Sequence, residues 1–156
     1  CWVLNLKNIS FAHYNVKQGI KMRKQNKETG FSELVDIFKK LRGKNGCVWD
    51  KKQTHETLIK YLFEESRELK KAILKKDVEN MKEELGDVLL QVIFHAQIAK
   101  ENKLFDIYDV IECLNKKMIR RHPHVFGKSK VKTEKDVIDL WKKIKKNEKK
   151  IVKKSL

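Results

Sequence analysis

The sequence is poor in the residues that interrupt helices and in the long apolar runs that cross membranes. Its 156 residues include one proline, six glycines, three cysteines and 8% aromatic side chains. The longest stretch with almost no charge, residues 85–99, contains Asp87 and is shorter than the roughly 20 apolar residues that a membrane-spanning helix requires. We therefore expect no membrane span. Because a chain of this length is one ordinary domain, we also expect no second large domain.

The cysteines, Cys1, Cys47 and Cys113, are odd in number and widely spaced, and neither a CxxC pair nor a secretory signal accompanies them. This pattern is typical of reduced thiols, and it predicts a cytoplasmic protein. The chain begins with Cys1 rather than methionine. Both a fragment of a longer chain and an unusual start are therefore open.

The net charge of +16 is unevenly distributed along the chain. It amounts to +7 over residues 1–56, −3 over residues 57–112 and +12 over residues 113–156. A basic excess of this size is consistent with simple solubility and with attraction of a polyanion, either nucleic acid or a nucleotide. Charge alone leaves both interpretations open.

Apolar side chains recur at helical spacing from residue 31 onward, and no alternating pattern typical of strands competes with it. We therefore expect an all-α fold. The helices are predicted from Phe31 to about Leu41, from Thr54 to about Lys76, from Asp77 through residue 99, from Asp106 to just before Pro123, and from Thr133 onward. The expected N-terminal caps are Ser32, Thr54, Asp77 and Thr133.

Outside these helices the sequence predicts an arm of unknown role at residues 1–30, a loop at residues 44–54 and a basic tail at residues 151–156. Residues 31–150 form the predicted folded domain. Between residues 85 and 99 the third helix is apolar on nearly every side, which is typical of a buried helix. A monomer would expose too much of this surface, so we expect a homodimer or a larger homo-oligomer.

Four acidic residues on the second and third predicted helices carry the strongest chemical signal. Glu65 and Glu68 are three residues apart, as are Glu84 and Asp87, so each pair projects from one side of its helix. Glu65 interrupts an apolar seam, and Asp87 is the only charge in its apolar run. An unpaired carboxylate is very unfavourable in such surroundings, so these acids need a partner.

Three kinds of partner are available. Lysine or arginine could pair with the acids, but Arg67, Lys70 and Lys71 can instead pair outward with Glu64. Four protonated carboxyl groups in two matched pairs would be an unusual coincidence. A hard divalent cation is the third and favoured partner, because Mg²⁺, with Mn²⁺ as a substitute, prefers oxygen ligands and keeps waters that a phosphate can replace.

Histidines are not expected to bind this cation. Di-iron helix bundles use Glu-x-x-His pairs, and neither acidic pair here ends in histidine. His95 lies on the face of Asp87, but we expect it to be a hydrogen-bonded core residue. We interpret His122 and His124, which flank Pro123, as hydrogen-bonding residues that fix a turn.

A basic group lies at the end of the fourth predicted helix. Lys117 and Arg121 are four residues apart, so both can reach one anion, and Arg120 lies beside them. A guanidinium group suits bidentate contact with phosphate. The alternative is a solvated basic helix end that complements the helix dipole.

Six sequence blocks follow one another along the chain: CVWD at 47–50, QTH at 53–55, EESRE at 64–68, EELGD at 83–87, FHA at 94–96 and RRHPHVFG at 120–127. Taken in this order, the blocks closely resemble those of the MazG family of nucleoside triphosphate pyrophosphohydrolases. The resemblance extends over residues 31 to about 145 and implies an all-α helix bundle completed by dimerisation. One departure is Val48, where the family usually has proline, and it bears on the rigidity of the loop.

The resemblance also implies a reaction and roles for residues. The reaction is Mg²⁺-dependent hydrolysis of NTPs or dNTPs to a nucleoside monophosphate and pyrophosphate, through attack of a metal-activated water on the α-phosphate. The implied metal ligands are Glu65, Glu68, Glu84 and Asp87. The implied candidates for the general base are Glu64, Glu68 and Glu83. The implied substrate-binding residues are Lys117, Arg120, Arg121, Trp49 and Trp141.

Two alternatives remain at this point. One is a pyrophosphatase of the same fold restricted to dUTP or dCTP. The other is a basic helical protein that binds nucleic acid without catalysis, which the charge of residues 113–156 supports. The second alternative leaves the buried acids unexplained, so we expect a nucleotide partner, and neither nucleic acid nor a membrane.

Overall fold

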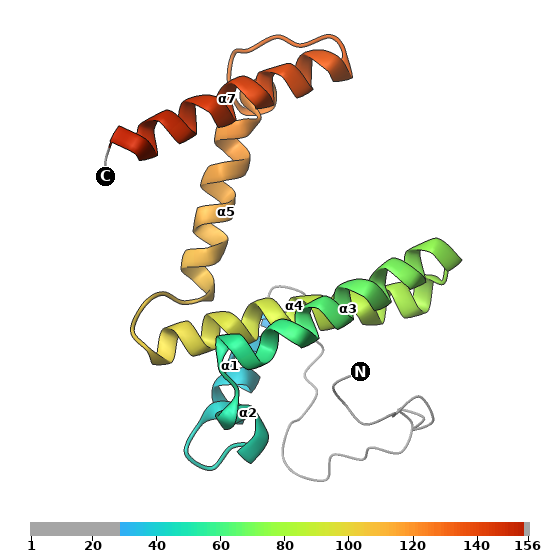
Figure 1. The fold of residues 1–156 in the computed structure, drawn as a ribbon, viewed down its shortest axis with the longest axis vertical. Coiled ribbons are helices and arrows are strands. Elements are labelled where there is room, and N and C mark those ends of the chain that lie inside the picture. Colours follow the sequence, from blue (N-terminus) through green and yellow to red (C-terminus); the bar gives the residue numbers. More distant parts are fainter. Residues whose placement is uncertain (1–28, 155–156) are drawn as a thin grey trace. The chain divides into compact units, whose positions relative to one another are not determined.

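The computed structural model describes residues 29–154, in which every regular element is an α-helix (Figure 1). The elements are α1 Thr29–Arg42, α2 Val48–Lys52, α3 His55–Lys75, α4 Val78–Glu101, α5 Ile107–Arg121, α6 Pro123–Phe126 and α7 Glu134–Lys154. The all-α prediction is confirmed. Residues 1–28 of the predicted arm and residues 155–156 of the predicted tail lie outside the described residues.

The chain divides after Asp106 into two compact units. In the first unit, α3 and α4 form an antiparallel hairpin, and α1 packs against α4 and α2 (Figure 1). Phe38 of α1 meets Phe94 of α4 edge to face, with ring centroids 5.6 Å apart. The side chains that fill this core are Phe38, Leu58, Ala72, Ile93, Phe94, Ala96, Ile98 and Ala99.

The ends of the hairpin helices follow from their local sequence. Thr54 caps α3, because its Oγ1 accepts a hydrogen bond from the backbone N–H of Thr57 at 3.3 Å. At the other end Lys76 adopts a left-handed conformation, with φ 56°, and closes the helix. Asp77 then caps α4 by accepting a hydrogen bond from the N–H of Asn80 at 3.2 Å. The predicted caps Thr54 and Asp77 are thus confirmed.

Two local predictions for the segment before the hairpin are wrong. Ser32 lies inside the first turn of α1 and is not its cap. The predicted loop at residues 44–54 contains α2, which is too short to show a helical period in its sequence. The chain turns sharply at Gly46, where a Cβ atom would collide with the carbonyl oxygens of Lys40 and Leu41. This glycine allows Cys47 to donate to the carbonyl oxygen of Leu41 at 2.8 Å.

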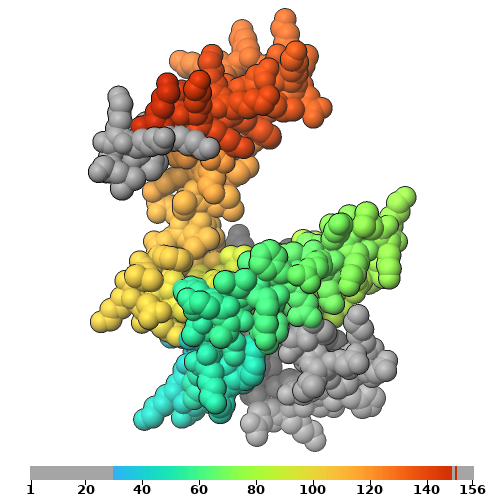
Figure 2. Space-filling view, in the orientation of Figure 1, coloured from blue at the N-terminus to red at the C-terminus, as the bar shows by residue number. Residues whose placement is uncertain are grey.

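Helix α4 is not buried on every side within one chain. The side chains of Leu85, Leu89 and Val92 remain 52%, 39% and 40% exposed, although α3 covers the opposite face. In the space-filling view the side chains of α3 and α4 pack continuously along the hairpin (Figure 2). The prediction of complete burial is therefore wrong for a single chain. Among the described residues of the first unit, an apolar face of α4 has no helix covering it.

The second unit contains α5, α6 and α7. The predicted N-terminal cap Thr133 is confirmed, because its Oγ1 accepts a hydrogen bond from the N–H of Asp136 at 3.2 Å. Trp141 of α7 meets the ring of His122 edge to face, with centroids 5.2 Å apart. Across residues 29–154, none of the helices has the length and apolar character needed to span a membrane. Both cysteines in this range, Cys47 and Cys113, carry free thiols.

Candidate active site

Three of the four predicted acidic ligands converge between the two helices of the hairpin. Glu65 comes from α3, whereas Glu84 and Asp87 come from successive turns of α4, and one carboxylate oxygen from each lies within 4.8 Å of the others. The spacing of three residues aligns Glu84 with Asp87 on one side of α4. The antiparallel packing of the helices then brings Glu65 opposite them.

The surroundings of these acids are unfavourable for negative charge. Glu65 is only 1% exposed, and neither of its carboxylate oxygens has a hydrogen-bond partner among the described residues. Burial, followed by the nearby charges of Asp87, Glu68 and Glu84, raises the pKa of Glu65 to about 7. Burial also raises the pKa of Asp87 above its ordinary value, and the charges of Glu83 and Glu68 add to this effect.

These donors fit a hard divalent cation. All three are carboxylate oxygens, which Mg²⁺ and Mn²⁺ accept and which softer metals do not favour. A cation between them would replace the missing partners of Glu65 and offset the repulsion between like charges. Glu68 does not belong to the group of three, but its charge raises the pKa of both Glu65 and Asp87. It therefore lies beside the cluster.

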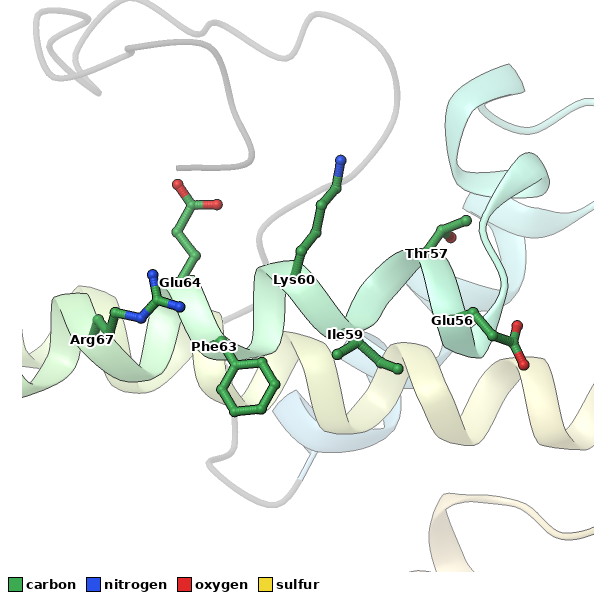
Figure 3. Close-up of a pocket in the computed structure, with 7 residues that line it drawn as sticks. All are labelled: Glu56, Thr57, Ile59, Lys60, Phe63, Glu64 and Arg67. Atoms are coloured by element: carbon green, nitrogen blue, oxygen red, sulfur yellow. The ribbon is translucent and has the colours of Figure 1, made fainter.

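The candidates for the general base differ in position. Glu83 is exposed on α4, and its charge acts on Asp87. Glu64 lines a shallow groove on the surface of α3, together with Lys60, Phe63 and Arg67. Figure 3 shows that Glu64 and Lys60 project from one side of α3 and Phe63 from another. Of the three candidates, Glu68 and Glu83 are therefore the two whose charges raise the pKa of Asp87.

Trp49, a predicted substrate contact, lies against α3, the helix that carries Glu65. It belongs to α2, is 38% exposed and meets the ring of Tyr61 edge to face at a centroid distance of 5.9 Å. Tyr61 precedes Glu65 by four residues, which is about one turn of α3. The residue of α3 that the indole ring contacts is therefore about one helical turn before Glu65.

The basic substrate candidates lie in the second unit, where an acidic residue holds two of them. Glu148 of α7 accepts hydrogen bonds from Arg120 Nε at 2.7 Å and from Arg121 Nη2 at 2.7 Å. These bonds lower the pKa of Glu148 to about 2. Lys117 is half-buried on α5. Trp141 has a buried indole N–H with no hydrogen-bond partner among the described residues.

The histidines take part in ring contacts and turns. His55 and His95 stack with parallel rings, and their Nδ1 atoms are 2.8 Å apart. His95 is thus hydrogen-bonded, as predicted. His122 Nδ1 contacts the carbonyl oxygen of Met118 at 2.7 Å, which confirms its role in the turn. For His124 the hydrogen-bonding role stays a prediction, since its buried Nδ1 has no partner in the described part of the chain.

Arg42 is a structural residue that the sequence did not reveal. Its side chain is 7% exposed and binds Glu101 at the end of α4, with an Nη2–Oε2 distance of 2.8 Å. Its Nη1 also donates to the backbone carbonyl oxygens of Asp50 and Gln53, on both sides of the end of α2. Arg42 thereby joins α1, α2 and α4, and it fixes the short helix that carries Trp49. No local pattern indicates contacts so distant in sequence.

Replacing Arg42 by methionine is expected to lower the free energy of unfolding by about 3 kcal/mol, because the carbonyl oxygens of Asp50 and Gln53 lose the hydrogen bonds that they accept from Arg42, and Glu101 loses its ion pair. Chemical denaturation followed by circular dichroism measures the change. Lys82→Met is the matched control, since it removes an exposed ion pair with Glu79 and should change stability very little. Equal stability of the two variants would contradict a joining role for Arg42.

These features define an all-α protein in which a helical hairpin carries a buried carboxylate cluster suited to a divalent cation. Residues 53–126 match the MazG nucleotide pyrophosphohydrolase domain. The crystal structure of a mazG-related protein from Thermotoga maritima superimposes with a TM-score of 0.62 at 30% identity, covering 74% of this chain and 98% of that one. The chain belongs to the MazG family.

Longer relatives share the same region. The chain is 64% identical over 105 residues to "Nucleoside triphosphate pyrophosphohydrolase/pyrophosphatase MazG" of Thermotoga maritima, covering 66% of this chain and 41% of that protein. It is 42% identical over 116 residues to "Nucleoside triphosphate pyrophosphohydrolase" of Escherichia coli K12, covering 74% of this chain and 44% of that protein. The chain thus spans less than half the length of these two relatives.

Proposed function

We propose that this chain hydrolyses nucleoside triphosphates, either NTPs or dNTPs, to nucleoside monophosphate and pyrophosphate in the cytoplasm. Membership of the MazG family and the names of its relatives support this reaction. The observation that carries the proposal is the convergence of Glu65, Glu84 and Asp87 within 4.8 Å. Buried acids so close together are suited to hold Mg²⁺, or Mn²⁺ in its place, next to a phosphate.

In this proposal Glu65, Glu68, Glu84 and Asp87 hold the cation. When bound, Mg²⁺ supplies charge for the phosphate oxygens and lowers the pKa of a coordinated water. One carboxylate accepts the proton of the water that attacks the α-phosphorus, and pyrophosphate leaves. Of the candidates Glu64, Glu68 and Glu83, the last two are favoured because their charges act on Asp87.

The remaining proposed roles concern the nucleotide. Lys117, Arg120 and Arg121 bind its phosphates, and Trp49 and Trp141 contact its base. For Trp49 the support is its exposed ring beside Tyr61, about one turn from Glu65. For Arg120 and Arg121 the support is that their guanidinium groups already bind the carboxylate of Glu148. A phosphate could replace that carboxylate.

A panel of the eight common NTPs and dNTPs tests the function. Each nucleotide is incubated with Mg²⁺ or with EDTA, and nucleoside monophosphate, pyrophosphate and orthophosphate are quantified separately. Release of monophosphate and pyrophosphate in equal amounts with Mg²⁺, but not with EDTA, is the expected result. Activity confined to dUTP or dCTP would identify the restricted form of the enzyme, and orthophosphate as the first product would overturn the proposal.

We further propose that the chain forms a homodimer or a larger homo-oligomer through the apolar face of α4. Leu85, Leu89 and Val92 are substantially exposed on this face, and a contiguous apolar surface of this kind marks an interface. Within the MazG family such pairing would complete the helix bundle around the acids.

Leu85→Lys is expected to convert the oligomer to a monomer, because the interface would have to bury an unpaired charge. Sedimentation equilibrium measures the mass of both forms. Leu104→Lys is the control, since Leu104 is 69% exposed and lies beyond the end of α4, and it should leave the mass unchanged. A monomeric wild-type protein at micromolar concentration would contradict the proposal.

A further inference from the structure

Gln91 is a fully buried amide that the fold does not satisfy. Its side chain lies on α4 and is 0% exposed. Neither its Oε1 nor its Nε2 has a hydrogen-bond partner among the described residues. A buried polar group without partners destabilises the folded state, so its presence in a helix core calls for a ligand or a functional reason.

The position of Gln91 points to the acidic cluster. It follows Asp87 by four residues and Glu84 by seven, so the three residues lie on one side of α4. Helical side chains lean toward the N-terminus of their helix, which directs the Gln91 amide over the turn that holds Asp87. Glu65 of α3, which lies opposite that turn, also has two buried oxygens without partners. The unsatisfied amide and the unsatisfied carboxylate therefore share one region of the hairpin.

Another glutamine of the same helix shows what a structural amide looks like here. Gln97 is 9% exposed and donates from Nε2 to Glu101 Oε1 at 2.9 Å. Its amide thus supports the ion pair between Glu101 and Arg42. Within residues 29–154, Gln91 makes no such bond, although its side chain is more deeply buried.

We propose that Gln91 is a positioning residue of the cation site, whose amide becomes hydrogen-bonded only when the cation and its waters are bound. The amide oxygen can accept from a water held by the cation, while the NH₂ group can donate to the carboxylate of Glu65. Mg²⁺ keeps several of its waters in protein sites, so such a contact is available. This inference rests on the proposed cation site and adds a residue outside the acidic pairs.

Mn²⁺ binding to the full chain without nucleotide tests the inference. The affinity is measured by electron paramagnetic resonance of free Mn²⁺, and the melting temperature is measured in EDTA. The variants are Gln91→Met, which keeps the side-chain length and removes the amide, and Gln97→Met as the matched control. Gln91→Asn is the second variant, because it keeps the amide but withdraws it from the cluster.

Gln91→Met is expected to weaken Mn²⁺ binding by tenfold or more and to raise the melting temperature in EDTA by about 2–4 °C. Gln97→Met should bind Mn²⁺ like the wild type and melt at a lower temperature, since it loses a hydrogen bond. Gln91→Asn should also weaken binding by about tenfold, and it decides the question if Gln91→Met does not fold.

Other results would overturn the inference. If the Gln91 variants bind Mn²⁺ as tightly as the wild type, a buried water serving the amide alone explains Gln91, and the proposed function is unaffected. If the wild type itself binds no Mn²⁺, the proposed cation site fails, and the inference about Gln91 fails with it. The wild-type measurement therefore separates the two failures.

Discussion

Asp87→Asn is expected to reduce Mg²⁺-dependent pyrophosphate release by roughly 10³-fold or more. The amide keeps the shape of the side chain but removes a negative charge from the three acids that are proposed to hold the cation. A cation held less tightly loses several kcal/mol of transition-state stabilisation, and each 1.4 kcal/mol corresponds to about tenfold in rate. The measurement is the initial rate of pyrophosphate formation from the best substrate of the panel, across a range of Mg²⁺ concentrations.

Asp36→Asn is the control, because Asp36 is exposed on α1 and its substitution removes the same charge from the surface. This variant should retain wild-type activity. The Asp87 variant should remain folded, since it removes a negative charge that burial disfavours, as the raised pKa of Asp87 indicates. Full activity of folded Asp87→Asn would show that the reaction does not depend on this cluster.

Glu65→Gln is expected to stabilise the metal-free protein at neutral pH and above. Burial raises the pKa of Glu65 to about 7 from an ordinary 4.5, so between these values the folded state binds more protons than the unfolded state. The stability that the protonated Glu65 contributes is therefore lost as the pH rises from about 4.5 through about 7. Above pH 7 the glutamine variant should be more stable by roughly 3 kcal/mol, because it has no buried charge.

Urea denaturation in EDTA at several pH values measures this difference. Burial and the charge of His55 lower the pKa of His95. This histidine therefore makes the free energy of unfolding decrease as the pH falls below about 6.5, the ordinary pKa of histidine, which is opposite to the effect of Glu65. Because wild type and variant share His95, the difference between them isolates Glu65. Glu79→Gln, at an exposed position of α4, should show no such trend. A pH-independent difference for Glu65→Gln would mean that its carboxyl group is not desolvated.

Most of the hairpin, including its acids, could be predicted from the sequence because the signals are local. The Thr54 and Asp77 caps act within one turn, and the helical period of the apolar residues extends over both helices. Glu65 and Asp87 stand out because each is a charge at an apolar position. The convergence of these two residues required only that the helices pack side by side.

The parts that could not be predicted depend on contacts between distant residues. Arg42 and Glu101 are 59 positions apart, and no residue next to either of them in the sequence indicates that they pair. The helix α2 is held by such contacts and by the turn at Gly46. Because none of these contacts is visible in the sequence of its five residues, the sequence predicts a loop there. Gln91 resembles an ordinary polar interruption of an apolar helix until the burial and missing partners of its amide are known.

The turn between α3 and α4 has a consequence for how the protein folds. Glu65, Glu84 and Asp87 all come from the two helices that this turn connects, so closing one short loop brings them together. Contacts between residues close in sequence form early and fast during folding. The like-charged acids therefore become neighbours through the pairing of α3 and α4 alone, and their approach does not require α1. A divalent cation bound between them would consequently stabilise the pairing of these two helices in the folded state.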